Sequence, residues 1–422
     1  MQIKEIRINN FKGISSLEFN PKKINIIVGR NNTGKTSVLE AINLLFDPDE
    51  ISRYPSKYIS DIVNFEAKSS ELTAILSNQN PPTSLEILKP TDKADKTEII
   101  YTFKKNLIEI LTNALMRVDK YKKDVKEKIE ITEEIKHEIE NKIEKLITSE
   151  LRSNILNKSI IVIKNKKDKK IKYHLEDKEE IQQVLEILKK LTEYINNKQD
   201  SELAKHSNFQ RTIMNAAFEL LLDEIYKYSY EVSNKRKVIL IKNLLEKGIE
   251  EERKTPKKQK RIYEIEVIIK QHNLLENLER LDLDYVGFKE GTEIKFVPFS
   301  FLGDGFKAIV MLLFNLSNVK NKIVLLDEPE THMHPGYIRE LVTMLIKISK
   351  ELNIQFFIST HSGDFIDSFF DENFSPEELE YLKKELLIVR MGKIGNSTIV
   401  GCSDYEKSKY DKKELLLDLR GI

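Results

Sequence analysis

The stretch of sequence most suited to chemistry is a glycine-rich loop near the N-terminus, Gly29-Arg30-Asn31-Asn32-Thr33-Gly34-Lys35-Thr36. Glycines at this spacing let successive backbone N–H groups turn toward phosphate oxygens. The lysine places a positive charge on the β- and γ-phosphates, and the threonine hydroxyl can hold Mg²⁺. An apolar run at 24–28 precedes the loop and a helical stripe at 35–46 follows it, so the positive end of a helix points at the anion. An accidental glycine turn is the weaker explanation, and the sequence predicts a phosphate-binding P-loop.

Two adjacent acids end a second apolar run far along the chain. Ile323–Leu326 predicts a buried strand, and Asp327 and Glu328 follow it directly. Hydrolysis of a bound nucleoside triphosphate needs one carboxylate that holds Mg²⁺ and a second group that orients or activates water. Alone, the two acids would also fit the solvated end of an ordinary core strand. Together with the P-loop they favour nucleotide hydrolysis.

Four segments resemble motifs of ABC-type ATPases of the SMC/RecF/OLD group. Residues 327–335, Asp-Glu-Pro-Glu-Thr-His-Met-His-Pro, are similar to the Walker B and D-loop stretch of that group, and Ile358–Ser362 is similar to its switch-histidine motif. Asn9–Gly13 resembles the turn that follows the first strand. Leu302–Gly305 lies where the ABC signature belongs. Its Gly-Asp-Gly resembles the form found in OLD-family (overcoming lysogenization defect) ATPases and departs from the Leu-Ser-Gly-Gly-Gln of transporters.

The resemblance covers residues 1–46 and 285–401 and implies an α/β fold. That fold is a P-loop NTPase whose ABC-type ATPase head is formed by N- and C-terminal segments. We expect these segments to span residues 1–100 and 263–422, with a mainly helical, partly coiled-coil-like insertion at 101–262. Ordinary amphipathic helices packed into one lobe fit the insertion about as well, because its heptads are not sustained.

The resemblance also assigns roles to individual residues. Glu328 corresponds to the carboxylate that orients or deprotonates water, His361 to the sensor of the γ-phosphate, and Thr36 and Asp327 to the Mg²⁺ ligands. The ATP-binding positions are Gly29, Arg30, Asn31, Asn32, Thr33, Gly34, Lys35, Thr36 and Ser37, with Gly303, Asp304 and Gly305 of the signature. No equivalent of the Q-loop glutamine of ABC proteins is clear.

The signature glycines carry a prediction about assembly. Two glycines at a helix start expose N–H groups for an anion, and no phosphate remains for them within their own P-loop site. In ABC-type proteins that anion is the γ-phosphate held by the opposite subunit, so the resemblance implies an ATP-sandwich homodimer or a higher homo-oligomer. A glycine N-cap with a local hydrogen-bonding role for Asp304 is the alternative.

Hydrophobic spacing predicts the remaining elements. Apolar residues three and four apart predict helices within 111–146, 181–195 and 212–245, and Ile160–Ile163 with Ile171–His174 predicts a small hairpin around a lysine-rich turn. The head is expected to add strands at 3–8, 16–19, 263–269, 285–288, 294–297 and 354–359, helices at 306–316 and 337–352, and a last hairpin from 386–390 and 397–401.

The composition excludes several classes of protein. The 422 residues include 69 Lys and Arg against 68 Asp and Glu, and this balance excludes a protein that coats nucleic acid through bulk charge. The single cysteine, Cys402, excludes an intramolecular disulfide and a cysteine-ligated zinc finger. No stretch approaches the ~18 apolar residues of a membrane span, and the charged N-terminus does not resemble a signal peptide. We therefore expect a cytoplasmic protein without membrane contact.

Two further acidic or histidine-rich features are weaker candidates. OLD-family nucleases continue into a Toprim domain rich in acidic metal ligands, but Asp404, Glu406 and Asp411 do not form such a set. We therefore expect an ATPase without a nuclease of its own. His332 and His334 could share one face of a strand as metal ligands, although a loop role is favoured because no Cys or further His lies nearby.

The leading hypothesis is an ATP-hydrolysing homodimer that uses ATP and Mg²⁺ and acts in anti-phage defence, gating a separately encoded nuclease or toxin. The alternatives are an SMC/RecF-like DNA repair ATPase and an ATP-binding assembly scaffold with little turnover. The sequence leaves open whether DNA is bound, what triggers the ATPase, and which effector it serves.

Overall fold

The computed structural model describes residues 2–47, 62–77, 79–88, 160–164, 169–172, 238–242, 262–267, 277–282, 284–316, 319–331 and 333–414, together with a few isolated positions. The chain forms two compact units. The first comprises Met1–Asp47, Glu71–Leu85 and Lys237–Ile422, and the second comprises Pro48–Ser70 and Glu86–Arg236. Every site residue predicted above lies in the first unit.

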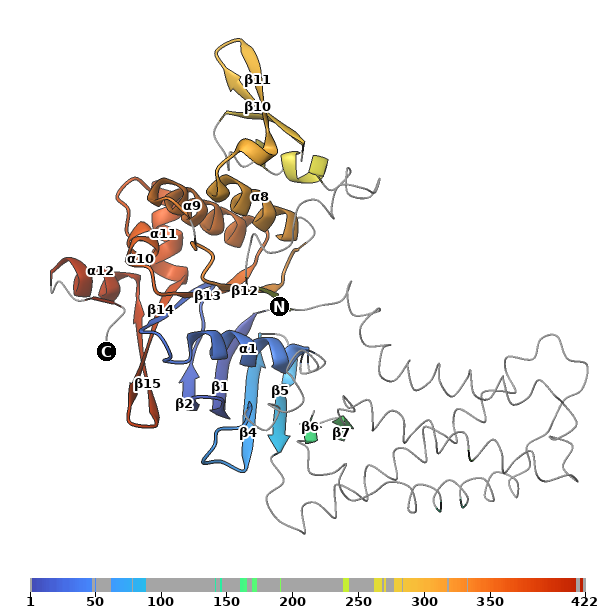
Figure 1. The fold of residues 1–422 in the computed structure, drawn as a ribbon. Coiled ribbons are helices and arrows are strands. Elements are labelled where there is room, and N and C mark those ends of the chain that lie inside the picture. The colour runs from blue at the N-terminus through green and yellow to red at the C-terminus, as the bar shows by residue number, and fades with distance from the viewer. Residues whose placement is uncertain are drawn as a thin grey trace, which may run out of the picture. The chain divides into compact units, whose positions relative to one another are not determined.

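A six-stranded sheet forms the middle layer of the first unit (Figure 1). Its order is β15-β14-β3-β13-β12-β8, and only the β14–β15 pair is antiparallel. The strands are β3 (Ile24–Gly29), β8 (Val238–Ile241), β12 (Ile323–Asp327), β13 (Gln355–Thr360), β14 (Leu386–Ile394) and β15 (Ser397–Asp404). β3 and β13 are buried along their whole length, as expected for parallel strands covered on both faces. The predicted α/β class with a parallel sheet is confirmed.

One face of this sheet is covered by a single helix and a second sheet. Helix α1 (Lys35–Phe46) contacts β3, β12, β13 and β8 on one side and β1 on the other. In this unit the second sheet has the order β2-β1-β4-β5, with β1 (Ile3–Phe11), β2 (Ile14–Phe19), β4 (Ser69–Leu76) and β5 (Gln79–Leu88). β1 and β2 confirm the predicted strands, whereas β4 and β5 were not predicted.

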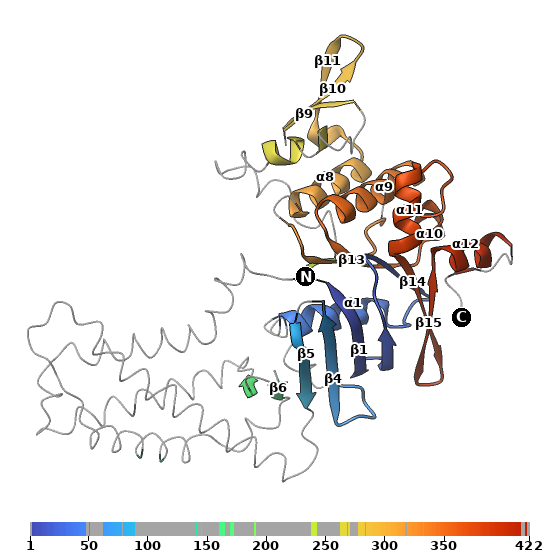
Figure 2. The same cartoon turned by 180° about the vertical axis from the view of Figure 1, so that it is seen from behind.

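The other face is covered by helices α8 (Asp304–Leu316), α9 (Pro335–Glu351), α10 (Gly363–Ser368) and α11 (Pro376–Glu385), as Figure 2 shows from behind. α9 turns one stripe inward, Leu341, Leu345 and Ile348, which are spaced as the buried side of an amphipathic helix requires. These side chains share one core with Ile26 of β3 and Phe356 of β13. Helix α12 (Tyr405–Lys413) follows β15.

A three-stranded antiparallel sheet leads into α8. Its order is β11-β10-β9, with β9 (Leu278–Leu281), β10 (Tyr285–Glu290) and β11 (Glu293–Pro298), and the predicted hairpin at 285–297 is confirmed. The strand predicted at 263–269 is wrong, because residues 262–267 and 269–270 are helical. Ile265 and Ile269 are both buried and lie four residues apart, so the same residues fit one face of a helix.

The second unit contains the predicted lysine-rich hairpin. β6 (Ile160–Lys164) and β7 (Lys169–Lys172) pair antiparallel, and Glu86–Leu88 at the end of β5 pairs with β6. The helices predicted at 111–146 and 181–195 lie almost entirely outside the described residues.

The helix predicted at 212–245 is wrong where the structure describes it. Residues Val238–Ile241 form β8, which pairs parallel with β12 at the edge of the large sheet of the first unit. Val-Ile-Leu-Ile is a strongly β-forming run, and pairing with a buried strand overrides the helical spacing.

Candidate functional site

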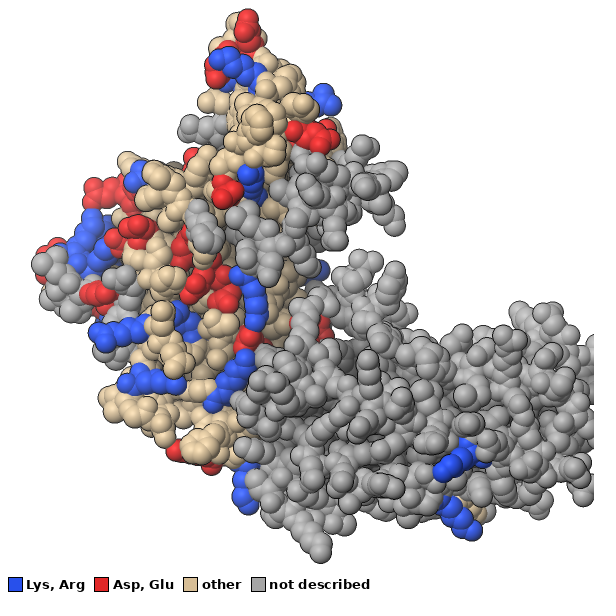
Figure 3. All heavy atoms as spheres, in the orientation of Figure 1, with Lys and Arg blue, Asp and Glu red and all other residues tan. Residues whose placement is uncertain are grey.

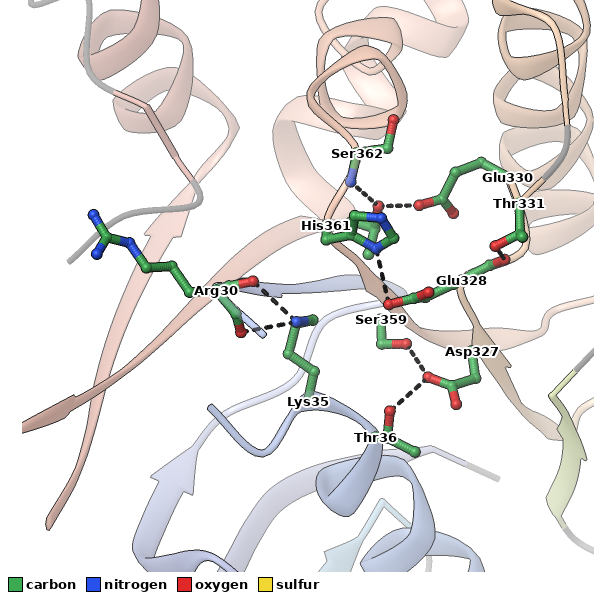
Figure 4. A network of polar contacts seen from close by, with 12 residues as sticks. Arg30, Lys35, Thr36, Asp327, Glu328, Glu330, Thr331, Ser359, His361 and Ser362 are labelled. Carbon is green, nitrogen blue, oxygen red and sulfur yellow. Dashed lines mark hydrogen bonds and ion pairs between the residues drawn. The ribbon is translucent and has the colours of Figure 1, made fainter. Parts of the chain in front are cut away.

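Three loops that each follow a parallel strand meet at one edge of the large sheet (Figure 4). They leave the ends of β3, β12 and β13, and β13 lies between the other two strands. The edge formed by the carboxyl ends of parallel strands is where open α/β sheets bind ligands. The P-loop, the two acids after β12 and the histidine after β13 are thus neighbours, although Thr36 of the P-loop and Asp327 are 291 residues apart in the chain.

The P-loop has the backbone that its glycines were expected to allow. Gly34 has a φ of 102°, in the region that favours glycine, and it caps the N-terminus of α1. A side chain at Gly29 would place its Cβ 2.4 Å from the carbonyl oxygen of Met391, so β14 leaves no room for any other residue there. The chain can make this turn only with glycine at both positions.

Lys35 lies over this loop. Its side chain is 7 % exposed, and its Nζ donates to the carbonyl oxygens of Gly29 at 2.9 Å and Arg30 at 3.0 Å. Burial lowers the pKa of the Lys35 ammonium, and the carboxylates of Glu328, Asp327 and Glu330 act in the opposite direction. The Lys35 ammonium is therefore a buried cation whose N–H groups can exchange the loop carbonyls for a bound anion as hydrogen-bond acceptor.

The other P-loop side chains divide into internal and exposed groups. Thr33 is buried and donates from Oγ1 to the Arg30 carbonyl at 2.9 Å, which closes the loop on itself. Arg30, Asn31 and Asn32 are exposed, and Figure 4 shows the Arg30 side chain pointing away from Lys35. Ser37 is half-buried in the first turn of α1.

Thr36 and Asp327 meet across the site. Thr36 Oγ1 donates to Asp327 Oδ1 at 3.0 Å, and the same carboxylate oxygen accepts a short hydrogen bond from Ser359 Oγ. A hydroxyl and a carboxylate are hard oxygen donors of the kind that Mg²⁺ prefers, usually with waters and substrate phosphates completing its shell. The predicted pair of metal ligands therefore fits Mg²⁺ in chemistry and in placement.

Glu328 and His361 form a second contact, beside that of Asp327 with Ser359, between the ends of β12 and β13. His361 Nδ1 lies 2.9 Å from Glu328 Oε1, and both side chains are partly exposed at the site. Glu328 has a φ of 50°, which is uncommon for a residue with a side chain. Its backbone N–H donates to the Ser359 carbonyl at 3.0 Å and its carbonyl accepts from Thr331 Oγ1 at 2.8 Å, so both sides of the strained residue are held.

Glu330 is a site residue to which the sequence analysis gave no role. It is only 6 % exposed, and its Oε1 accepts a short hydrogen bond from Thr360 Oγ1, whereas Oε2 is buried without a partner. Burial raises the pKa of Glu330 to about 7. Two features of the sequence could have pointed to Glu330: it is a third acid, three residues after Asp327, and a hydroxyl residue directly precedes His361.

The signature segment at the start of α8 has two different glycines. Gly303 is exposed, and a Cβ added there would meet nothing within 4 Å. Gly305 is buried, and a Cβ there would lie 2.6 Å from Tyr337 Cγ on α9. Asp304 is exposed and lies 3.4 Å from Lys307 Nζ. The packing of α8 on α9 thus explains Gly305, whereas nothing within the described part of this chain requires a glycine at position 303.

The weaker candidates have structural roles where they are described. His334 caps α9, because its Nδ1 accepts a hydrogen bond from the Gly336 N–H at 3.2 Å, and His332 lies outside the described residues. Asp404 caps α12, and Asp411 is ion-paired with Arg390. Within the described ranges, no three His, Cys, Asp or Glu side chains are grouped as ligands for one metal ion.

Comparison with known proteins gives several relatives. The chain is 23 % identical over 428 aligned positions to the endonuclease GajA of Bacillus cereus, which covers 87 % of this chain and 59 % of GajA. It is 39 % identical over 83 positions to the DNA replication and repair protein RecF of Psychromonas ingrahamii, which covers 19 % of this chain and 22 % of RecF. This chain thus matches less than two thirds of either protein's length. Among solved structures, the SMC head domain of Pyrococcus furiosus bound to the C-terminal domain of ScpA has a TM-score of 0.41 at 14 % identity, over 99 % of this chain and 100 % of that one.

No helix in the described parts of the chain has the length and apolar character needed to span a membrane. The model of the AAA ATPase domain family AAA_15 matches residues 1–366, which is most of the chain and includes the P-loop, the acids after β12 and the histidine after β13. The protein therefore belongs to the AAA_15 family of AAA ATPase domains.

Proposed function

We propose that this protein binds and hydrolyses Mg-ATP in a homodimer in which two chains complete each active site. One observation carries the proposal. Five side chains meet at one edge of the large sheet: Lys35, Thr36, Asp327, Glu328 and His361. The lysine can bind phosphate, the hydroxyl and the first carboxylate can bind a metal ion, and the second carboxylate with the imidazole can act on water and the γ-phosphate. Membership of an ATPase family supports the same reaction.

Each side chain has a separate part in that reaction. Lys35 and the amides of the P-loop neutralise charge on the β- and γ-phosphates. Thr36 and Asp327 would hold Mg²⁺, which when bound would supply positive charge beside the phosphate oxygens. Glu328 orients or deprotonates the attacking water, and its hydrogen bond to His361 fixes the direction of the carboxylate. His361, on the loop after β13, then reads the presence of the γ-phosphate.

The exposed end of α8 supports the shared active site. Gly303 has open space on its outer side, and its carbonyl accepts from the Lys307 N–H at 3.2 Å, so α8 begins there. The first N–H groups of a helix have no partner within the helix and attract anions. In the proposed dimer, the signature residues Gly303, Asp304 and Gly305 lie against the γ-phosphate bound by Lys35 of a second copy of the chain.

The biological role proposed is that of an ATPase in OLD-like anti-phage defence that gates a separate nuclease or toxin. The match to the endonuclease GajA extends over 87 % of this chain, and this extent supports the proposal. A RecF-like repair ATPase is the second candidate, because local identity to RecF proteins reaches 48 % over 46 residues. That match covers 11 % of this chain, so it bears on a short segment rather than on the whole protein.

DNA is a candidate activator in both roles. Figure 3 shows basic and acidic side chains interspersed on the described part of one face, which suits local contacts rather than a broad basic surface. The test is the ATPase rate of the purified protein alone, with double-stranded DNA and with single-stranded DNA, beside the Lys35→Ala variant. Hydrolysis that Lys35→Ala abolishes supports the enzyme, whereas ATP binding without hydrolysis in every condition favours an assembly scaffold. Stimulation by DNA supports a DNA-linked role.

A further inference from the structure

Glu330 is a buried acid next to the proposed site without an assigned task. It lies on the loop after β12, two residues beyond Glu328, and its exposed fraction is 6 %. Burying a carboxyl group is unfavourable unless hydrogen bonds compensate for the lost hydration. Here one oxygen has one partner and the other, Oε2, has none. An apolar side chain would fill this place at lower cost, so the fold alone does not account for a carboxyl group here.

The partner of Glu330 is the residue that precedes His361. Thr360 is the last residue of β13 and is fully buried. Its Oγ1 donates to Glu330 Oε1 and accepts a hydrogen bond from the Ser362 N–H at 3.0 Å. The hydroxyl thus ties the backbone on the far side of His361 to Glu330.

Three side-chain contacts connect the two loops, one for each of three consecutive residues. Ser359 donates to Asp327, Thr360 donates to Glu330, and His361 lies against Glu328. The first contact involves a metal ligand and the third involves the water-activating carboxylate. The second contact, between Thr360 and Glu330, is the buried one of the three. Neither of its two residues has a proposed role in binding phosphate or metal.

We propose that Glu330 is a positioning residue for hydrolysis: through Thr360 it holds the turn that carries His361, so that the imidazole stays against Glu328. The proposal rests on the proposed ATPase function and adds a residue to its machinery. A loop shift of about 1 Å at a catalytic group can cost on the order of 100-fold in rate, so a buried link of this kind can matter without touching substrate.

The structure also indicates which form of Glu330 suits this task. The pKa of Glu330 is raised to about 7, first by burial and further by the nearby carboxylate of Glu328, while Thr360 and His361 lower it. Lys35 is a further charged group that interacts with it. A neutral acid keeps the acceptor oxygen for Thr360 and adds no negative charge beside Glu328. Glutamine has the same shape, the same acceptor and no charge, so it should replace Glu330.

The experiment compares paired variants by steady-state ATP hydrolysis. Glu330→Ala and Thr360→Val remove the two ends of the link, and each should lower kcat by about 10- to 100-fold with KM for ATP nearly unchanged. Glu330→Gln and Thr360→Ser keep the acceptor and the hydroxyl, and each should stay within about threefold of the wild type. The double variant Glu330→Ala/Thr360→Val should be no slower than the slower single variant, because both changes remove one interaction.

A matched control separates positioning from general loss of packing. Ser349 on α9 is 1 % exposed, its Oγ donates to the Ile354 carbonyl at 2.9 Å, and the same oxygen lies 2.8 Å from Tyr381 Oη. Ile354 directly precedes β13, whereas Thr360 ends that strand, so the control lies at the opposite end of β13 from the site. Ser349→Ala removes a buried hydroxyl together with its hydrogen bonds, and it should leave kcat unchanged. Equal losses of kcat in Ser349→Ala and Thr360→Val would overturn the proposal. Equal losses in Glu330→Gln and Glu330→Ala would overturn it as well.

A second readout does not depend on turnover. The ¹⁵N signals of the His361 imidazole, assigned with His361→Gln, report the contact between Nδ1 and Glu328. Glu330→Ala and Thr360→Val should move these signals toward their positions in Glu328→Gln, and Glu330→Gln should leave them in place. If the wild type hydrolyses no ATP, the proposed function fails and these signals still decide the positioning role. Unmoved signals in both Glu330→Ala and Thr360→Val would contradict it.

Discussion

Thr36 Oγ1 lies 3.0 Å from Asp327 Oδ1, although 291 residues of chain separate the two side chains. Thr36 lies in the first turn of α1, which follows β3, and Asp327 ends β12, with β13 between the two strands in the sheet. The N- and C-terminal parts of the chain must therefore fold together before a metal site exists. This pair joins the phosphate-binding loop to the acids that would activate water.

Replacing the P-loop lysine tests the phosphate site. Lys35→Ala removes a buried cation that donates to two loop carbonyls. The protein should remain folded, but bound ATP loses the main positive charge beside its phosphates. We expect hydrolysis to fall on the order of 10²–10³-fold, with weaker ATP binding. Lys350→Ala, which removes an exposed ion pair with Glu377, is the control and should hydrolyse ATP normally. Wild-type hydrolysis by Lys35→Ala would show that the nucleotide binds elsewhere.

Replacing the carboxylate after the metal ligand tests water activation. Glu328→Gln keeps Asp327 and Thr36 for Mg²⁺ and keeps a side chain that can contact His361, but it cannot take a proton. The rate of hydrolysis should fall by about 10²–10⁴-fold, and ATP-bound dimers should accumulate in size-exclusion chromatography. Glu377→Gln on α11 is the matched control. Normal turnover by Glu328→Gln would mean that another acid, with Glu330 the nearest, acts on the water.

The buried acid makes stability depend on pH. The pKa of Glu330 is about 7 in the folded protein because of burial, against a reference value of 4.5. Between these values the folded chain holds a proton that the unfolded chain has released, so stability falls as pH rises from 4.5 and levels off above 7. The whole change corresponds to about 3 kcal/mol.

Glu330→Gln has no such proton and isolates this effect. Relative to the wild type, it should gain stability between pH 5 and pH 8, and urea unfolding at several pH values measures the difference. A difference between the two proteins that stays constant over this range would show that Glu330 is ionised throughout.

The sequence predicted those elements whose local hydrophobic pattern favours the same conformation as their pairing in the sheet. Residues 24–28 are apolar throughout and become the buried strand β3, and the motifs at 29–36 and 327–328 lie where their order implied. β5 was missed because Pro81 and Pro82 disfavour a strand, and it forms nevertheless beside β4. β8 was missed because a partner strand more than 80 residues away, β12, decides its conformation.

The candidate site shows the same division. Lys35, Asp327 and Glu328 could be predicted because the glycine loop and the apolar run before the acids point, taken together, to one nucleotide chemistry. The link between Glu330 and Thr360 depends on which side chains two loops turn toward each other after the sheet has formed, and no spacing in the sequence encodes that. The same holds for Gly305, whose lack of a side chain is explained by Tyr337 on the neighbouring helix.

The central claim is that two chains complete each active site, and mixing two inactive variants tests it most directly. Gly303→Trp should block the approach of the partner's γ-phosphate, and its own fold should tolerate the change. A Cβ at Gly303 meets nothing within 4 Å, and the φ of Gly303 is not among the positive values. Gly303→Trp alone should still bind ATP and should not hydrolyse it, and Lys35→Ala alone should bind ATP more weakly and hydrolyse little of it.

In a mixed dimer, Lys35 of the Gly303→Trp chain meets the intact signature of the Lys35→Ala chain, which restores one complete site of two. An equal mixture that exchanges at random should recover about a quarter of the wild-type rate, because half of its dimers are mixed. Tags of two kinds on the variants verify that mixed dimers form. Recovery near this level is the result that the shared site predicts. Mixed dimers that form and hydrolyse no more ATP than either variant alone would contradict it.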